Sequence, residues 1–115
     1  MKVINRIKKS EDFALTINDG VSRRFPSYSL FARKTDIGYT RVGISASKKL
    51  GNAVVRNRAK RQVRAICDQV IDYSKQSLDI VVIIKNKFLD ESFDNNKSQL
   101  CDFMKGLLKW KEVQK

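Results

Sequence analysis

Residues 41–64 read RVGISASKKLGNAVVRNRAKRQVR, and this stretch decides the fold that we expect for the chain. Residues 41–45 alternate between polar or small side chains and apolar ones, which is typical of a β-strand. Gly51 and Asn52 favour a turn. From Val54 onward the apolar residues recur at helical spacing, so the pattern predicts a strand, a short connection and a long helix.

The predicted helix spans residues 54–73 and has two chemically different sides. At about 100° per residue, its apolar side chains fall within one narrow arc, which predicts a stripe that faces the core. This stripe consists of Val55, Ala59, Val63, Ile66 and Val70. Polar residues cover most of the remaining surface: Arg56, Lys60 and Arg64 on one flank, Arg58 on the opposite flank, and Asn57 and Arg61 between the first flank and the solvent side.

Positive charge is concentrated in the same stretch. The 115 residues include 24 Lys and Arg against 12 Asp and Glu, a formal net charge of +12. Residues 41–67 contain eight basic residues and no acidic one, and so carry two thirds of that charge. Folding alone gains nothing from a like-charged cluster, because its members repel one another. The cluster therefore indicates a polyanionic partner, with nucleic acid the first candidate and an anionic membrane surface the second.

Upstream of this stretch the pattern predicts a helix, a strand and a turn. Ser10 is expected to cap a helix whose first two acids suit the positive end of the helix dipole, and Gly20 is expected to end it. The apolar face of this helix would contain Phe13, Ala14 and Ile17. Residues 27–32 alternate as a strand with Phe31 on one face, and residues 36–38 are typical of a turn.

Downstream, the pattern predicts a buried strand and a last helix. Residues 78–84 (LDIVVII) are typical of a strand that is buried on both faces. Residues 92–95 offer caps for the helix that follows. The apolar stripe of this helix would contain Leu100, Met104, Leu107 and Leu108, with Trp110 as a core anchor at its end.

The order of these elements predicts the fold class. A strand, a helix and then a buried strand predict a parallel β-α-β crossover. We therefore expect an α+β fold, a two-layer sandwich with helices packed on a small mixed four-stranded sheet. A chain of this length is expected to form a single domain over residues 1–115. General topology favours a right-handed crossover.

Residue types argue against catalysis or metal binding by the protein itself. The chain has no histidine, the commonest general base, and Cys67 and Cys101 are too few for a structural zinc site. We expect no catalytic residue, no metal and two partly buried thiols. The acidic residues lie mostly in residues 68–115, away from the expected basic surface. Asp68 and Asp72 are spaced i, i+4 on the predicted helix and are interpreted as a solvated helix face.

The chain is expected to be cytoplasmic. No apolar run approaches the about 20 residues of a transmembrane helix. Residues 1–6 also lack the apolar core of a signal peptide. A membrane-surface role would need exposed aromatic residues on the basic helix, but the core requires the modest apolar face of that helix. We therefore expect no membrane partner.

The stretch 41–64 closely resembles the signature of the bacterial ribonuclease P protein family. The resemblance includes the KKLGNAV loop at residues 48–54 and the RNR triplet at residues 56–58 that opens the helix. Residues 7–13 (IKKSEDF) resemble the N-terminal helix entry of the family. Residues 79–84 lie where the family has a strand, so the resemblance extends over nearly the whole chain.

This resemblance implies a function. A protein of this family pairs with a large catalytic RNA, and together they remove the 5′ leader of precursor tRNA by endonucleolytic hydrolysis. The RNA performs the reaction with Mg²⁺, which makes the protein a non-catalytic subunit of the enzyme. The implied partners are the catalytic RNA and the precursor tRNA leader, and not DNA. The family fold has a left-handed crossover, and we expect that hand here in place of the general preference.

The family has two RNA-facing surfaces, which correspond by position to residues of this chain. The first, formed by the loop and the basic helix, corresponds to Lys48, Lys49, Asn52, Arg56, Asn57, Arg58, Lys60, Arg61 and Arg64. The second, a cleft for the single-stranded leader, corresponds to Phe13, Ile17 and Phe31. The family usually has an aromatic residue at the position of Ile17, so we expect an apolar contact there in place of a stacked base.

Alternatives stay open for several of these residues and for the function. Phe13 and Phe31 fit plain core packing as well as base stacking. Asn57 fits a hydrogen bond to RNA as well as a cap or brace for the start of the helix, and the Gly51-Asn52 pair fits a simple turn. A ribosomal or RNA-assembly binding module of similar fold would share the charge and the sandwich without any role in cleavage.

Overall fold

The sheet is four-stranded and mixed. A computed structural model of the chain describes the backbone of residues 1–113 and the side chains of residues 1–107. The strand order is β1-β2-β4-β3, in which β3 and β4 are parallel and the other pairs are antiparallel. The strands span Val21–Arg24 (β1), Tyr28–Lys34 (β2), Arg41–Ala46 (β3) and Leu78–Ile84 (β4). The mixed four-stranded sheet of the prediction is confirmed.

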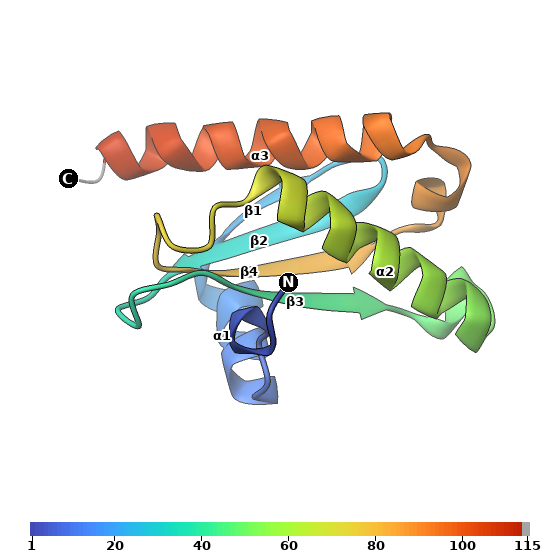
Figure 1. Cartoon of the computed structure of the whole chain (residues 1–115), viewed down its shortest axis with the longest axis horizontal. Helices are drawn as coiled ribbons and strands as arrows, with labels where there is room; N and C mark the ends of the chain where they lie inside the picture. Colours follow the sequence, from blue (N-terminus) through green and yellow to red (C-terminus); the bar gives the residue numbers. More distant parts are fainter. Residues whose placement is uncertain (114–115) are drawn as a thin grey trace.

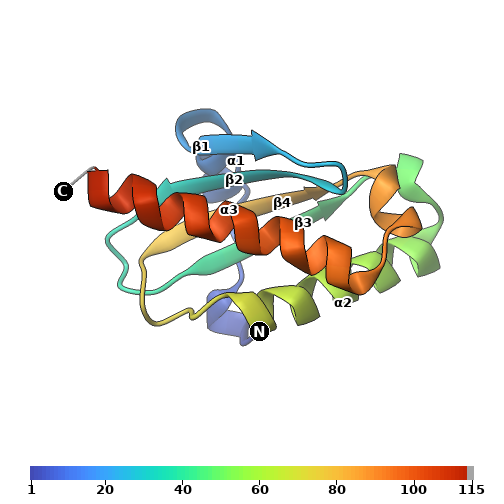
Figure 2. The same cartoon turned by 90° about the horizontal axis from the view of Figure 1, so that it is seen from above.

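Helices cover both faces of this sheet (Figures 1 and 2). α2 (Ala53–Val70) and α3 (Phe93–Val113) lie on one face, and α1 (Ser10–Asp19) packs on the other. The predicted α+β sandwich is therefore confirmed, with α1 as an added helix beneath it. Short 3-10 helices precede each long one: η1 (Val3–Asn5), η2 (Lys48–Leu50) and η3 (Asn86–Asp90). Over the described residues, no helix is both long and apolar enough to cross a membrane.

The β3-α2-β4 unit is the predicted parallel crossover. β3 and β4 are hydrogen-bonded neighbours, from the Arg41–Asp79 pair to the Ala46–Ile84 pair. In Figure 1 both strands point to the right and α2 lies above them, and Figure 2 shows β3 at the edge of the sheet, outside β4. A chain that runs from this edge strand through α2 and back to the inner strand winds in the left-handed sense. Most crossovers have the opposite hand.

β4 is the central strand and is buried on both faces. Ile80, Val82 and Ile84 belong to the core beneath α2 and α3, while Val81 on the α1 face is also fully buried. The predicted stripes of the two covering helices face the same core, which includes Ala59, Val63, Ile66, Leu100, Phe103 and Leu107. Removal of this apolar surface from water is the main favourable term in folding. It also fixes α2 along its apolar stripe and turns its basic residues outward.

A buried polar network fixes the start of α3 against β2. The Ser92 hydroxyl accepts the N–H of Asn95 at 3.1 Å, so the predicted cap is confirmed. The Tyr28 hydroxyl donates to the carbonyl oxygen of Asn96 at 2.7 Å. The Asn96 side chain in turn donates from Nδ2 to the carbonyl oxygen of Phe88 at 3.2 Å. Because buried polar groups need partners, these bonds set where η3 and α3 lie on the sheet.

Some predicted boundaries are wrong. The pattern did not locate β1, because this edge strand has mostly exposed side chains and no apolar alternation. Ser10 is the first residue of α1, and no side chain caps that helix. α2 ends at Val70, three residues early, because Ile71 adopts an extended conformation and is buried. The predicted contacts of Leu108 and Trp110 lie outside the described side chains.

Candidate nucleic-acid interface

Gly51 and Asn52 build the turn into α2. Gly51 has a φ of +153°, and a Cβ there would lie 2.9 Å from Cγ1 of Val55, so a side chain at this position is excluded. Asn52 caps the helix, because its Oδ1 accepts the N–H of Val55 at 3.0 Å. Asn57 is exposed and takes no part in the cap. The turn is therefore confirmed, and Asn52 rather than Asn57 caps the helix.

The basic side chains of η2 and α2 form a set without acidic partners, which we call the α2 basic surface. Its members are Lys48, Lys49, Arg56, Arg58, Lys60, Arg61 and Arg64. Among the described residues, none of the seven makes an ion pair within 4.0 Å. Arg56, Lys60 and Arg64 are half-buried along one flank of the helix, and the other four are exposed. The predicted first surface thus presents its charge to solvent.

Arg41 belongs to the same basic stretch of the sequence, but it is not part of this surface. Its guanidinium donates to both carboxylate oxygens of Asp79, from Nε at 2.9 Å and from Nη2 at 2.7 Å. Arg33 of β2 donates to the same carboxylate at 3.1 Å. Asp12 of α1 lies 3.4 Å from Arg41 and 4.0 Å from Arg33. Although Arg41 belongs to the acid-free stretch of the sequence, its charge is therefore neutralised by Asp79.

These four side chains form a paired cluster that joins α1 to three strands. Asp79 is fully buried, while the side chains of Arg33 and Arg41 are 26% and 18% exposed. The hydrogen bonds that Arg41 donates to Asp79 raise the pKa of Arg41 above its usual value. A buried charge is tolerated only with partners. The cluster is therefore a structural feature, and it leaves little of these two arginines for a ligand.

The sheet face beneath α1 brings together the predicted leader-cleft residues. A Cβ on Gly43 would lie 2.8 Å from Cδ2 of Phe13, so the Phe13 ring packs directly on the backbone of β3. Phe31 lies on the same face and in the same row, since it pairs with Val81, which pairs with Gly43. Phe13, Ile17 and Phe31 are all half-buried. Each of these side chains therefore contributes to packing and still exposes part of its surface to solvent.

A row of small and apolar residues continues this face toward η2. Ser29, Ile83 and Ser45 are partners across β2, β4 and β3, and each is half-buried. In Figure 1, α1 lies below the sheet near the start of β3, whereas α2 begins beyond its end. This row therefore connects the Phe13 and Phe31 face with the α2 basic surface. The sequence prediction missed these three residues, although the two-residue period of a strand puts Ser29 on the same face as Phe31.

Arg58 lies apart from the other cations, on the opposite flank of α2 as predicted. It lines a cavity of about 280 Å³ between α2 and the segment that joins η3 to α3. The other lining residues are Val55, Ala59, Gln62, Phe88, Leu89, Glu91 and Phe93. The α2 basic surface therefore has two sides, one with the row Arg56, Lys60 and Arg64 and one with Arg58 alone.

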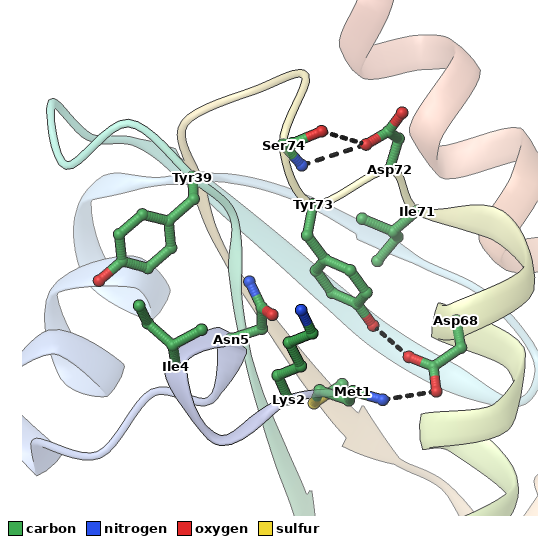
Figure 3. A pocket seen from close by; sticks show the side chains of 10 residues that line it. All are labelled: Met1, Lys2, Ile4, Asn5, Tyr39, Asp68, Ile71, Asp72, Tyr73 and Ser74. Atoms are coloured by element: carbon green, nitrogen blue, oxygen red, sulfur yellow. Dashed lines mark hydrogen bonds and ion pairs between the residues drawn. The ribbon is translucent and has the colours of Figure 1, made fainter.

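A second hollow, of about 780 Å³, lies at the C-terminal end of α2, one turn beyond Arg64 (Figure 3). It is lined by the N-terminal residues, Tyr39 and the end of α2. Asp68 accepts hydrogen bonds from the α-amino group of Met1 at 2.6 Å and from the Tyr73 hydroxyl at 2.8 Å. Burial alone would raise the pKa of Asp68, but these two bonds outweigh it and lower the pKa. Asp68 thus ties the N-terminal segment to α2.

Asp68 and Asp72 do not form the predicted helical i, i+4 pair. Asp72 lies beyond the end of α2, where its Oδ1 accepts the backbone N–H of Ser74 at 3.1 Å and the Ser74 hydroxyl at 2.7 Å. Cys67 is buried, which raises the pKa of its thiol to about 12, and Cys101 is half-buried. Within the part of the chain that the structure describes, no three His, Cys, Asp or Glu residues come together as metal ligands.

Comparison with known proteins agrees with this geometry. A family model described as Ribonuclease P matches residues 1–108. The ribonuclease P protein component of Mesoplasma florum is 41% identical over 110 residues, which cover 95% of this chain and 100% of that protein. The ribonuclease P protein component of Bacillus velezensis is 42% identical over 106 residues, which cover 87% of this chain and 86% of that protein.

Solved structures share the fold as well as the sequence. The RNase P protein of Staphylococcus aureus is 32% identical with a TM-score of 0.70, over 95% of this chain and 96% of that one. The RNase P protein of Thermotoga maritima is 31% identical with a TM-score of 0.73, over 85% of this chain and 93% of that one. The matched family region contains the whole sheet, α1, α2 and most of α3. The chain therefore belongs to the ribonuclease P protein family.

Proposed function

We propose that this chain is the protein subunit of ribonuclease P and that it assists a catalytic RNA in removing the 5′ leader of precursor tRNA. The α2 basic surface is the observation that carries this proposal. Within the described residues, its seven cations have no carboxylate partner. Protein surfaces normally intersperse both signs of charge. Unpaired cations in such number suit a polyanion whose phosphates supply the missing charge.

We assign the catalytic RNA to η2 and α2. Arg56, Lys60 and Arg64 repeat every four residues, so they form a row along the helix axis that can follow the phosphates of one strand. Arginine binds phosphate through two parallel hydrogen bonds, and lysine binds it as a point charge. Lys48 and Lys49 extend this row beyond the N-terminus of α2, where the helix dipole also favours an anion.

We assign the single-stranded leader to the sheet face beneath α1. The half-buried rings of Phe13 and Phe31 offer stacking surfaces, each worth about 1–3 kcal/mol per base. Stacking accepts every base, which suits an enzyme that must process many different precursors. Ile17 adds an apolar contact, and the hydroxyls of Ser29 and Ser45 can hydrogen-bond to sugar or phosphate along the same row.

We assign the chemistry to the RNA and its Mg²⁺, and not to side chains of this protein. The chain has no histidine, and the carboxylates nearest the proposed leader face, Asp12 and Asp79, are paired with Arg33 and Arg41. Mg²⁺ prefers oxygen ligands and is commonly held by phosphates. The role of the protein in this scheme is to hold the leader and to offset phosphate repulsion, which lowers the Mg²⁺ concentration that the RNA needs.

Cleavage of a precursor tRNA at low Mg²⁺ tests the proposal. The three reactions contain the RNA subunit alone, the protein alone and both together. We expect only the mixture to cut efficiently at the mature 5′ end. A protein that adds nothing to a competent RNA subunit would reject the proposal and favour a general RNA-binding module.

A pair of charge-matched variants locates the effect. Lys60→Gln with Arg64→Gln removes two cations from the α2 basic surface. Lys97→Gln with Lys105→Gln removes two from α3, outside that surface. We expect the first pair to lose most of the stimulation at low Mg²⁺ and the second to retain it. Equal losses would show that net charge, and not this surface, is responsible.

A further inference from the structure

The cavity beside Arg58 is lined by apolar, basic and acidic side chains. It lies between α2 and the η3–α3 segment, at the end of the molecule where α2 begins (Figure 1). Arg58 and Glu91 line the same cavity of about 280 Å³, yet they form no ion pair within 4.0 Å. Because these two oppositely charged side chains line one cavity without forming an ion pair, a polar group of a ligand can lie between them.

The carboxylate of Glu91 is held in place. Asn95 Nδ2 donates to Oε2 of Glu91 at 3.1 Å, which fixes the side chain from the first turn of α3. Glu91 is half-buried, and Oε1 retains its full capacity to accept hydrogen bonds. A carboxylate accepts hydrogen bonds and a guanidinium donates them. The two side chains together can therefore recognise a ligand group that has a hydrogen-bond donor beside a hydrogen-bond acceptor.

The apolar lining of the cavity is exposed. Leu89 and Phe93 keep 47% and 36% of their surface accessible, and Val54 at the start of α2 keeps 67%. These are three of the seven large apolar residues that are exposed in the described part of the chain. All three lie at the end of the molecule where α2 begins. Lys48, Lys49 and Lys87 lie on the short helices of the same end. An apolar surface with cations at the same end of the molecule suits a base together with its phosphates.

We infer that this cavity receives one unstacked nucleobase of the catalytic RNA. The cavity, of about 280 Å³, has room for one base and not only for a single water molecule. Phe93 and Leu89 contact the face of the base, Glu91 accepts from its exocyclic amino group, and Arg58 donates to the neighbouring ring or carbonyl acceptor. Adenine, cytosine and guanine have this amino group, and uracil does not.

The inference rests on the proposed function, because it names a contact within the same protein–RNA complex. It adds a base-reading site on the side of α2 that faces η3, away from the row of Arg56, Lys60 and Arg64. The row binds phosphates and is insensitive to base identity, whereas a carboxylate that accepts from an amino group selects among bases.

Glu91→Gln gives a test in which the sign of the effect is diagnostic. This change raises the formal net charge of +12 by one unit, so charge alone predicts tighter binding of RNA. The proposed site predicts weaker binding by about tenfold, since the amide replaces an acceptor of the base amino group with a weaker one and adds a competing donor. The amide oxygen can still accept from Asn95, so the fold is expected to be retained.

Asp90→Asn is the matched control, because Asp90 is the exposed neighbouring acid at the end of η3 and does not line the cavity. The probe is the full-length catalytic RNA of the same organism, and the dissociation constant is measured for the complete chain at fixed salt. We expect Asp90→Asn to bind as tightly as the wild type or more tightly. Phe93→Leu keeps an apolar side chain but removes the aromatic face, and we expect about fivefold weaker binding.

The possible outcomes separate the two proposals. Wild-type protein that does not bind the RNA would reject the proposed function itself. Wild-type protein that binds, together with Glu91→Gln that binds equally well or more tightly, would reject the base site and leave the proposed function intact. Weaker binding by Glu91→Gln at an unchanged thermal midpoint, with Asp90→Asn unaffected, would support the base site.

Discussion

Two groups of arginines in this protein have the same chemistry but different surroundings. Arg33 and Arg41 lie where β2 and β3 pair with the start of β4, and both bind the buried carboxylate of Asp79. Arg56 and Arg64 lie on a flank of α2, and no ion pair within 4.0 Å involves either of them over the residues described. The first group is neutralised within the protein. The second is left for a partner.

This difference shows that proximity in sequence does not decide what a charge does. Arg41 is only 15 residues from Arg56 and belongs to the same acid-free stretch. It is neutralised because β4 places Asp79 directly opposite it in the sheet. Among the described residues, no carboxylate forms an ion pair with the row Arg56, Lys60 and Arg64. The first group is explained by the need of a buried carboxylate for positively charged partners, and the second by an external polyanion.

The largest expected effect comes from breaking the paired cluster. Asp79→Ala leaves two partly buried guanidinium groups with only Asp12 nearby, and we expect a loss of about 3 kcal/mol in the free energy of unfolding. Urea denaturation monitored by circular dichroism measures it. Lys105→Ala, on an exposed part of α3, is the control and should change stability by less than about 0.5 kcal/mol. A loss of less than 1 kcal/mol for Asp79→Ala would mean that the cluster is not a structural requirement.

The next effect concerns the sheet face that lies between the two groups. Phe31→Ala should weaken binding of leader-bearing precursor tRNA to the assembled enzyme by about 5- to 150-fold, since one stacked base contributes about 1–3 kcal/mol. Binding of mature tRNA should change little. Phe31→Leu keeps most of the apolar volume and should show the same selectivity at lower risk to the fold. Equal losses for both tRNAs, or a lower unfolding midpoint alone, would assign Phe31 to core packing.

Arg64→Ala and Arg41→Ala sharpen the comparison directly. Arg64→Ala should weaken RNA binding and flatten the slope of log affinity against log salt by about 0.7–0.9, the contribution of one phosphate contact. Its unfolding free energy should stay within about 0.5 kcal/mol of the wild type. Arg41→Ala should show the reverse, with lower stability and an unchanged salt slope. If both variants changed the unfolding free energy and the salt slope in the same way, the two groups of arginines would not differ in role.

The smallest effect is expected at Asp68, which lies one turn beyond Arg64 on α2. Its pKa is lowered in the folded protein, so it stabilises the fold above its ordinary pKa of about 4 and loses this contribution as pH falls through the folded value. We expect Asp68→Asn to cost less than about 1 kcal/mol at pH 7, because this side chain is 43% exposed. Urea denaturation at pH 7 and at about pH 2.5 checks this, and the difference between the two proteins should be smaller at the lower pH. A difference that does not change with pH would rule out an ionic contribution.

Local patterns determined much of the fold. The strand before Ala46, the apolar stripe of α2, the turn at Gly51 and Asn52 and the buried strand at residues 78–84 could all be predicted, because each depends on a short period or on the conformation of one residue. The positions of Arg56, Lys60 and Arg64 on one flank follow from helical geometry alone. The left-handed crossover was expected only from the family resemblance.

Only the tertiary structure decided which of these features meet. The pairing of Arg41 with Asp79 joins residues 38 positions apart, and it follows from the register of β3 on β4. β1 has no apolar alternation, so only its hydrogen bonds to β2 identify it as a strand. Likewise, Glu91 faces Arg58 only because η3 returns the chain to the start of α2. Periodicity fixes the direction of a side chain within its own element, but contacts between elements depend on how those elements share one core.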